Sequence, residues 1–307
     1  MKVMITGVAG FIGSNLGDYL LAKGYDITGI DNLSYGLIEQ VPEEVNFYKM
    51  DIRSQDIFPL FEGVDVVFHL AAKNCIADCQ LDPIETADIN ITGSINVFEA
   101  CKKAEVKKVI FAESSALYEG STVFPTSENS EAPESFYAVS KYAGKYFAEA
   151  YQRFFNLNMT ALRYFNVYGP KQDYRRTIPP LMSAIIINLL KGQRPVLYGD
   201  GSKRRDFIYI DDVNRFHQIL ITDTRSNGVT YNIGSGLNYS VMDIYKAIES
   251  VLNTGLKPIF KPDLPGEAFQ NLADISEAKK LGWKSDISLE QGLQLSIDYI
   301  RRKIIIS

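Results

Sequence analysis

A tyrosine and a lysine four positions apart could together take a proton from a hydroxyl group. Tyr137 and Lys141 would share one face of a helix, because side chains at this spacing lie one above the other. A tyrosine phenol titrates near ~10, which is too high for a base at neutral pH. A nearby ammonium favours the phenolate and lowers this pKa. The spacing is also common on ordinary amphipathic helices, so the pair predicts proton transfer only beside a second functional motif.

Three glycines near the start of the chain could hold a dinucleotide. Gly7, Gly10 and Gly13 directly follow an apolar run and directly precede a helical pattern. Glycine can adopt the positive φ of a tight turn, and its missing side chain lets backbone N–H groups approach a diphosphate. The positive N-terminal end of the following helix favours the same anion. The spacing therefore predicts a dinucleotide-binding turn after the first strand.

An acidic residue at the end of the next apolar run indicates which dinucleotide binds. Asp31 lies 18 residues after Gly13, where a carboxylate can accept hydrogen bonds from the adenosine ribose. Its charge would repel a 2′-phosphate, and no arginine follows at once in Asp31-Asn32-Leu33-Ser34. The sequence favours NAD over NADP as the cofactor.

Short apolar runs alternate with longer helical patterns through the first half of the chain, which is typical of βαβ units and a parallel sheet. The second half is more irregular and is punctuated by prolines. We predict an α/β fold, a Rossmann-type, doubly wound parallel sheet with a smaller, partly interleaved C-terminal lobe. Residues 1–168 would form the NAD-binding domain, joined by later segments at roughly 206–235, and residues 169–307 would mainly bind substrate. The expected strands are Lys2–Thr6, Asp26–Ile30, Val64–Leu70 and Val106–Ala112, and the expected helices include Ser14–Lys23 and Thr92–Lys103.

The composition is that of an ordinary globular protein. Of 307 residues, 46% are hydrophobic and 22% are charged, and the formal net charge of −5 argues against a general binder of nucleic acid. The first expected strand begins at Lys2, and no apolar run is long enough to span a bilayer. We therefore expect a cytoplasmic protein that does not bind membranes. Three cysteines and two histidines indicate reduced thiols and no metal site.

With these motifs in order, the chain resembles the extended short-chain dehydrogenase/reductase superfamily, and within it the NAD-dependent epimerase/dehydratase branch. The glycine spacing, G-x-x-G-x-x-G, is one residue longer than in the common dehydrogenase fingerprint. The other matches extend along nearly the whole chain and are much less specific for the substrate than for the superfamily. They are Asp51-Ile52, His69-Leu70-Ala71-Ala72, Asn90-Ile91-Thr92-Gly93, Ser114-Ser115, Tyr137-Ala138-Val139-Ser140-Lys141, Arg163-Tyr164-Phe165-Asn166-Val167-Tyr168-Gly169-Pro170 and Arg205-Asp206-Phe207.

The resemblance implies a catalytic set and a cofactor site. Tyr137 would be the base, and Lys141 would also bind the nicotinamide ribose. Ser114 would orient the substrate oxygen, with Ser115 as the alternative. The adenine would lie at Asp51-Ile52. The residues expected around NAD are Gly7, Gly10, Phe11, Ile12, Gly13, Asp31, Asn32, Asp51, Ile52, Leu70, Ala71, Ala72, Tyr137 and Lys141.

The residues next to Ser114 favour one reaction type within this branch. Related dehydratases, and usually decarboxylases, carry a glutamate two positions after the catalytic hydroxyl, whereas this chain has Ala116, which cannot donate a proton. Glu113 precedes Ser114, and the alternation of a strand would point it away. The set suffices for transient oxidation, in which Tyr137 takes the proton of the sugar 4-hydroxyl and NAD takes the C4 hydride. The resulting 4-ketose would rotate and be reduced on its other face, so NAD would stay bound.

The resemblance also implies a nucleotide-sugar site. The leading interpretation is 4-epimerisation of UDP-glucose and UDP-galactose, and their N-acetyl forms stay open because Asn271 is intermediate in size at the position that limits them. The family usually has a phosphate-binding arginine where this chain has Leu264. The basic residues that could compensate are Lys203, Arg204, Arg175 and Arg176. The residues expected to contact substrate are Ser114, Ser115, Tyr137, Asn166, Tyr198, Arg205, Glu267 and Asn271.

Two other interpretations stay open at this point. The chain could be a dehydratase, decarboxylase or reductase acting on another nucleotide sugar. It could also be a catalytically silent NAD-binding regulator, which Leu264 favours and the intact Ser114, Tyr137 and Lys141 oppose. Relatives commonly form homodimers through two helices per subunit, so we expect a homodimer formed by the helices at roughly Thr92–Lys103 and Phe136–Phe155.

Overall fold

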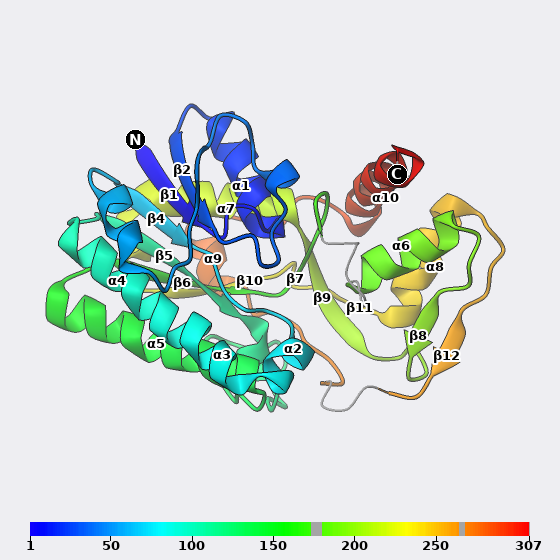
Figure 1. Ribbon diagram of the computed structural model, residues 1–307. Helices are drawn as coiled ribbons and strands as arrows, with labels where there is room; N and C mark the ends of the chain where they lie inside the picture. Colours follow the sequence, from blue (N-terminus) through cyan, green and yellow to red (C-terminus); the bar gives the residue numbers. More distant parts are fainter. Residues whose placement is uncertain (173–179, 264–267, 307) are drawn as a thin grey trace.

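Seven parallel strands form the central sheet of the computed structural model, which describes residues 1–172, 180–263 and 268–306 (Figure 1). The order across the sheet is β10-β6-β5-β4-β1-β2-β3, so the chain winds outward in both directions from β1. The strands are β1 Lys2–Thr6, β2 Asp26–Asp31, β3 Asn46–Lys49, β4 Val66–His69, β5 Lys108–Ser114, β6 Met159–Tyr164 and β10 Thr230–Ile233.

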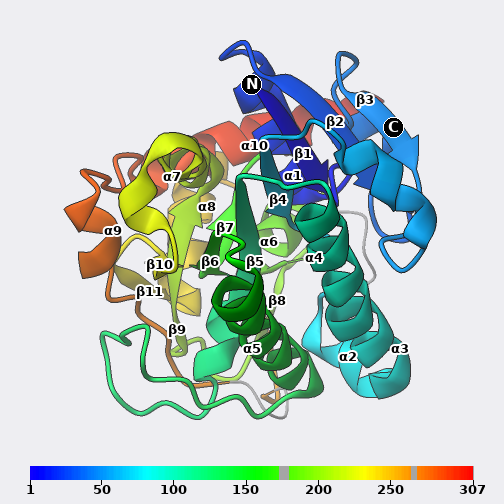
Figure 2. The same cartoon turned by 90° about the vertical axis from the view of Figure 1, so that its left-hand side faces the viewer.

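Helices cover both faces of this sheet, and the alternation of each strand supplies a core to both. In β1, Val3 and Ile5 belong to one buried cluster and Met4 to the other, because successive side chains point to opposite faces. Helices α1 Phe11–Leu21 and α7 Ile210–Thr222 pack together on the first face. Helices α4 Ser94–Lys103 and α5 Phe136–Phe155 lie side by side on the second (Figure 2).

The second half of the chain builds a smaller lobe beside the sheet, at the right of Figure 1. A three-stranded sheet in the order β11-β9-β7 leads into it, and a two-stranded sheet pairs β12 with β8. Besides α7 and β10, which belong to the large sheet and its cover, the elements of this half are β7 Asn166–Tyr168, α6 Leu181–Leu190, β8 Val196–Tyr198, β9 Arg204–Tyr209, β11 Asn238–Ser240, α8 Val241–Leu252, β12 Ile259–Lys261, α9 Ser276–Lys280 and α10 Leu289–Ile306. Among the described residues, no helix is long and apolar enough to cross a bilayer.

Short helical segments connect the strands near the site. Two short helices, α2 Ile76–Leu81 and α3 Pro83–Ala87, precede a π-helical turn at Asp88–Gly93, which leads directly into α4. The 3-10 turns are Ile38–Gln40, Gln55–Phe61, Ser115–Tyr118 and Thr224–Ser226.

The predicted Rossmann-type sheet with a smaller, interleaved lobe is confirmed, with local differences. The first strand and the helix Phe136–Phe155 have the predicted bounds. The strand expected at Val106–Ala112 instead covers Lys108–Ser114, because pairing with β6 continues as far as Ser114 and Tyr164. Helix α1 begins at Phe11, three residues before the predicted start, since the glycine turn leads straight into it. The division at residue 168 stays a proposal, which the return of α7 and β10 to the large sheet supports.

Candidate active site

Three adjoining cavities follow the edge at which the parallel strands end. The edge cavity, about 910 Å³ and open to solvent, lies beside Asp31 at the end of β2. The central cavity, about 890 Å³, lies beside Ser114 at the end of β5, and shares Gly7 and Gly10 with the edge cavity. The lobe cavity, about 830 Å³, meets the central cavity at Val167. One continuous groove therefore runs from the sheet to the smaller lobe.

The glycine turn lies between the edge and central cavities. The helix that follows it offers backbone N–H donors to an anion. Gly7 has a φ of +77°, and a Cβ there would approach the backbone nitrogen of Ala71 to 2.8 Å. Gly10 begins α1 without a side-chain cap, and no acidic residue lies in the first turn. The first N–H groups of a helix have no partner within it, so those of α1 are available to a ligand. The turn fits a dinucleotide diphosphate.

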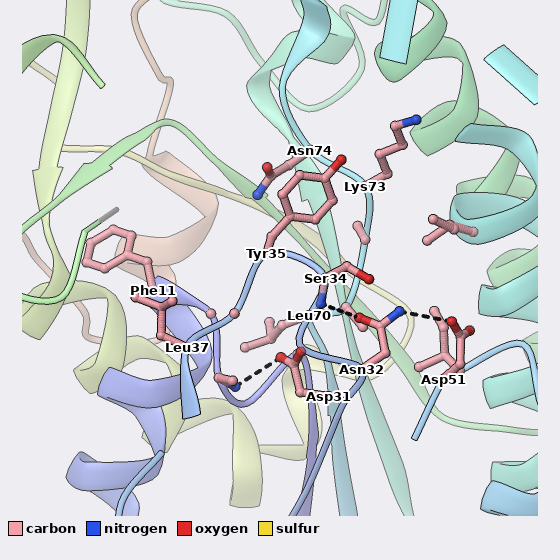
Figure 3. Close-up of a pocket in the computed structure, with 18 of the residues that line it drawn as sticks. Phe11, Asp31, Asn32, Ser34, Tyr35, Leu37, Asp51, Leu70, Lys73 and Asn74 are labelled. Atoms are coloured by element: carbon pink, nitrogen blue, oxygen red, sulfur yellow. Dashed lines mark hydrogen bonds between the residues drawn. The ribbon is translucent and has the colours of Figure 1, made fainter. Parts of the chain in front are cut away.

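Asp31 is held at the wall of the edge cavity by the backbone (Figure 3). Its carboxylate accepts the N–H of Ala9 at 3.0 Å and that of Leu33 at 2.8 Å. Burial raises the pKa of this carboxyl, and the two backbone donors oppose the shift. The ammonium of Lys73, another residue of this cavity, pairs with Glu85 instead of turning toward Asp31. The arrangement fits a ribose diol better than a 2′-phosphate.

Asn32, Asp51 and Ile52, which were predicted to lie near the adenosine, line the edge cavity. The Asn32 amide donates to Asp51 at 2.9 Å, and Arg53 pairs with the same carboxylate at 2.8 Å. The Arg53 guanidinium holds the pKa of Asp51 well below its usual range. Because Asn32 and Arg53 both bind Asp51, these side chains brace the wall, and buried Ile52 supplies its apolar surface.

Several residues that line the cavities were missed by the sequence prediction. Five of them belong to the loop that follows Asp31, and Figure 3 shows Tyr35 of this loop standing over the cavity. The glycine at position 36 is explained by the fold, because a Cβ there would meet the Ala9 side chain at 2.7 Å. The missed residues are Ala9, Ser34, Tyr35, Gly36, Leu37, Gln40, Met50, Lys73, Asn74 and Ile89 at the edge cavity, and Ala112, Glu113, Tyr164, Phe165 and Val167 at the central cavity.

The predicted catalytic residues Ser114, Tyr137 and Lys141 all line the central cavity together with the glycine turn. Tyr137 lies in the first turn of α5, which begins where the Ser135 hydroxyl caps the N–H of Ala138. Its backbone is braced, because the Ser140 hydroxyl donates to the Tyr137 carbonyl at 2.8 Å.

A second brace reaches this part of α5 from the π-helical turn. The buried Asn90 amide donates to the Ser140 hydroxyl at 2.9 Å, and its oxygen accepts the N–H of Lys73 at 2.8 Å. Asn90 thus ties the start of α5 to the segment after β4 that lines the edge cavity. A resemblance at Asn90 was noted in the sequence, but not this contact.

Burial controls the protonation of Tyr137 and Lys141. It raises the pKa of Tyr137 to about 12, although hydrogen bonding with Ser114 opposes this shift. It lowers the pKa of Lys141 to about 8, and the Lys141 ammonium donates to the Ala112 carbonyl at 2.9 Å. The expectation that Lys141 would lower the Tyr137 pKa is therefore wrong for the chain alone, because desolvation of the phenol dominates.

The surroundings of Ser114 separate it from its neighbours. Ser114 accepts the N–H of Ala116 at 3.1 Å and lines the central cavity, whereas Ser115 is not among that cavity's residues. The Glu113 carboxylate is buried and pairs with buried Arg163 at 2.7 Å. Glu113 also lines the central cavity, but its carboxylate is engaged by Arg163. That Glu113 takes no part in the reaction, and so does not replace an acid at Ala116, stays a prediction.

The lobe cavity brings together three of the residues predicted to bind substrate. Asn166, Tyr198 and Arg205 line it, and so does Lys203, one of the suggested replacements for the missing arginine. Arg204 turns away and donates to Asn238. Four predicted or suggested residues, Leu264, Glu267, Arg175 and Arg176, lie outside the described residues.

Asn271 lies beside Asn166, which lines the lobe cavity. The Asn166 amide donates to the Asn271 oxygen at 3.2 Å, and the same oxygen accepts the N–H of Asp206 at 2.8 Å. The Asp206 carboxylate in turn accepts the N–H groups of Ser235 and Ala273. Asn271 is thus fixed by its oxygen.

Within the part of the chain that the structure describes, no group of three His, Cys, Asp or Glu residues could hold a metal ion.

Comparisons with known proteins agree with this geometry. The sequence profile of the NAD dependent epimerase/dehydratase family matches residues 3–234. The UDP-glucose 4-epimerase of Mycolicibacterium smegmatis is 32% identical over 99% of both chains. The UDP-glucuronate 4-epimerase of Thermodesulfobacterium geofontis is also 32% identical, over 98% of this chain and 96% of the relative. The crystal structure of UDP-glucose 4-epimerase from Thermotoga maritima with UDP-glucose has a TM-score of 0.95, 34% identity, and coverage of 99% and 100%.

Replacing Lys141 should stabilise the nucleotide-free chain. Its folded pKa of about 8 lies below the ordinary 10.5, so the unfolded state binds more protons between these values and the cost of burying the charge is fully present below pH 8. Lys141→Met should raise the free energy of unfolding at pH 7 by about 1–3 kcal/mol. In urea titrations this gain should shrink as the pH rises from 8 to 10.5, while the exposed control Lys49→Met shows neither effect. A less stable Lys141→Met protein would contradict this account.

Replacing Asp31 should weaken the preference for NAD. Asp31→Asn removes the charge that repels a 2′-phosphate, so the ratio of the NADP to the NAD dissociation constant should fall at least about tenfold. Calorimetric titration with both cofactors measures the ratio. Asp26→Asn, at the exposed start of the same strand, is the matched control. An unchanged ratio in Asp31→Asn would show that another group sets cofactor choice.

Proposed function

The chain belongs to the NAD-dependent epimerase/dehydratase family, and from this premise we propose that it is a UDP-hexose 4-epimerase that interconverts UDP-glucose and UDP-galactose. One observation carries the proposal. Ser114, Tyr137 and Lys141 meet the glycine turn at the central cavity, and Ala116 leaves this strand end without an acid for elimination. Such a site can oxidise an alcohol and reduce the ketone again, but it lacks the group that would expel water.

The residues around the edge and central cavities fit NAD. Backbone N–H groups of the first turn of α1 would hold the diphosphate, and Asp31 would accept the adenosine ribose hydroxyls. The Lys141 ammonium, at the floor of the central cavity, would bind the nicotinamide ribose. When bound, NAD accepts a hydride from the sugar C4 and returns it.

Tyr137 and Ser114 would manage the proton of the sugar 4-hydroxyl. Tyr137 takes it as the carbon is oxidised and returns it on reduction, while Ser114 hydrogen-bonds the same oxygen and holds it in place. The phenol needs help to ionise, because burial alone raises its pKa to about 12. The positive charge of a bound cofactor would supply that help by favouring the phenolate.

The lobe cavity would hold the rest of the substrate. Arg205 and Lys203 would bind the diphosphate, and Lys203 would thereby replace the arginine lost at Leu264. Tyr198 would pack on the nucleobase. Asn166 and Asn271 would line the sugar site, and the carbonyl oxygen of Asn271 is already engaged by Asn166 and Asp206. The central and lobe cavities adjoin at Val167, and the ketose would turn between its two faces at this join.

The proposal can be tested with sugar nucleotides and without added NAD. Purified protein should convert UDP-galactose to UDP-glucose. UDP-N-acetylgalactosamine and UDP-glucuronate, assayed in parallel by chromatography, define how far Asn271 widens the range. A 4-keto-6-deoxy product would overturn the epimerase assignment. No turnover of any nucleotide sugar by protein that still holds NAD would favour the regulator.

A pair of tyrosine variants tests the assigned base. Tyr137→Phe should retain bound NAD and lose turnover by at least about a thousandfold. Tyr48→Phe, exposed on β3 at the far edge of the sheet, should behave like the wild type. Activity retained in Tyr137→Phe would sink the role given to this phenol.

The exposed surface of α5 supports the expectation of a homodimer. Helices α4 and α5 lie together on one side of the molecule (Figure 2), and α5 carries apolar side chains on its outer surface. Val139, Tyr146, Phe147 and Phe154 are 48%, 55%, 40% and 72% exposed. Burying this surface in a helix bundle with a second copy would remove it from water.

Light scattering combined with gel filtration tests the proposed dimer. The wild type should elute with twice the mass of one chain, and Phe154→Glu should shift it toward the monomer because a carboxylate would be buried in the interface. Lys49→Glu, on the far edge of the sheet, is the control. A monomeric wild type would contradict the proposal.

A further inference from the structure

A loop that no sequence motif identified forms the outer wall of the edge cavity. We call residues 32–40 the cover loop, which includes the 3-10 turn Ile38–Gln40. The cover loop is fastened to the glycine turn and to Asp31. The N–H of Leu37 donates to the Ala9 carbonyl at 3.1 Å, and the N–H of Leu33 donates to the Asp31 carboxylate at 2.8 Å. The cover-loop residues that line the cavity are Asn32, Ser34, Tyr35, Gly36, Leu37 and Gln40.

The far end of the cover loop is fastened by a residue 131 positions later in the chain. The Lys171 ammonium donates to the Gln40 carbonyl at 3.1 Å, and the Gln40 side-chain amide donates back to the Lys171 carbonyl at 3.0 Å. The same ammonium reaches the Ser14 carbonyl at 3.4 Å and pairs with Asp18 on α1. One lysine thus ties the loop to the helix whose N-terminus faces the diphosphate site.

Lys171 lies in a turn with an unusual backbone conformation. Its φ of +66° is left-handed, a conformation that side chains other than glycine rarely adopt, so its contacts must hold the backbone there. Its neighbour Gln172 lines the lobe cavity and donates to the Val167 carbonyl at 3.0 Å. The short turn after β7 therefore touches the cover loop on one side and the sugar site on the other.

We propose that Lys171 and Gln40 form a clasp that keeps the cover loop closed over the cofactor and so slows release of NAD. The inference rests on the proposed function, which requires NAD to remain bound through many turnovers. A dinucleotide under the cover loop leaves when this outer wall opens, and opening breaks the reciprocal contacts of the clasp. Their loss should therefore raise the dissociation rate more than the association rate.

The test measures release of NAD from the loaded protein without any sugar nucleotide. Alcohol dehydrogenase and ethanol in excess convert each released NAD to NADH, whose absorbance reports the rate. Lys171→Met and Gln40→Ala should each release NAD about tenfold faster than the wild type. The double variant should be no more than about twice as fast as the faster single variant, because either change opens the same clasp. Lys191→Met, exposed at the end of α6, should match the wild type.

Other outcomes bear on the clasp separately from the epimerase assignment. Wild-type release rates in Lys171→Met and Gln40→Ala would overturn it, and so would effects that multiply in the double variant. If Lys171→Met does not fold, Gln40→Ala and Asp18→Asn carry the test, and both should speed release several-fold. Since no sugar is present, a protein inactive on every nucleotide sugar can still show the clasp, and an active epimerase can still lack it.

Discussion

The direction of the strands is the constraint on which the rest of the structure depends. All seven strands of the large sheet are parallel, so the segments that follow their carboxyl ends emerge at one edge. Gly7 after β1, Asp31 at the end of β2 and Ser114 at the end of β5 are far apart in sequence and adjacent in space for this reason alone. The strands themselves contribute packing, and the chemistry belongs to the residues at their ends and to the helix that follows β5.

At this edge the phenol of Tyr137 and the ammonium of Lys141 are buried, and burial shifts the pKa of both groups. Burial raises the pKa of Tyr137 to about 12 and lowers that of Lys141 to about 8. Each shift disfavours the charged form that a proton-transfer site needs. The chain alone is therefore poorly poised for the reaction, and a bound positive charge beside the phenol would favour the phenolate of Tyr137.

Much of the fold and the centre of the site could be predicted because their signals are local. The strand Lys2–Thr6, the turn at Gly7–Gly13 and the helix Phe136–Phe155 each follow from residues next to one another. The cover loop, the Asn90–Ser140 brace and the clasp at Lys171 could not, because each is made by residues that meet only after the sheet has formed. Local patterns also gave the wrong direction for the pKa shift of Tyr137, because they show the neighbouring lysine and not the burial of the phenol. The role proposed for Lys203 likewise depends on the cavity that its side chain lines. The spacing of residues in the sequence does not determine this cavity.

The central claim is that one cavity removes a hydrogen from the sugar C4 and returns it to the same carbon. UDP-galactose labelled with deuterium at C4 and with carbon-13 in the sugar, mixed with unlabelled UDP-galactose, tests this claim directly by mass spectrometry of the products. The account predicts that deuterium stays at C4 of the carbon-13-labelled UDP-glucose, with no loss to water and no transfer to unlabelled sugar. Exchange of the label with solvent, or its appearance in unlabelled molecules, would contradict the account.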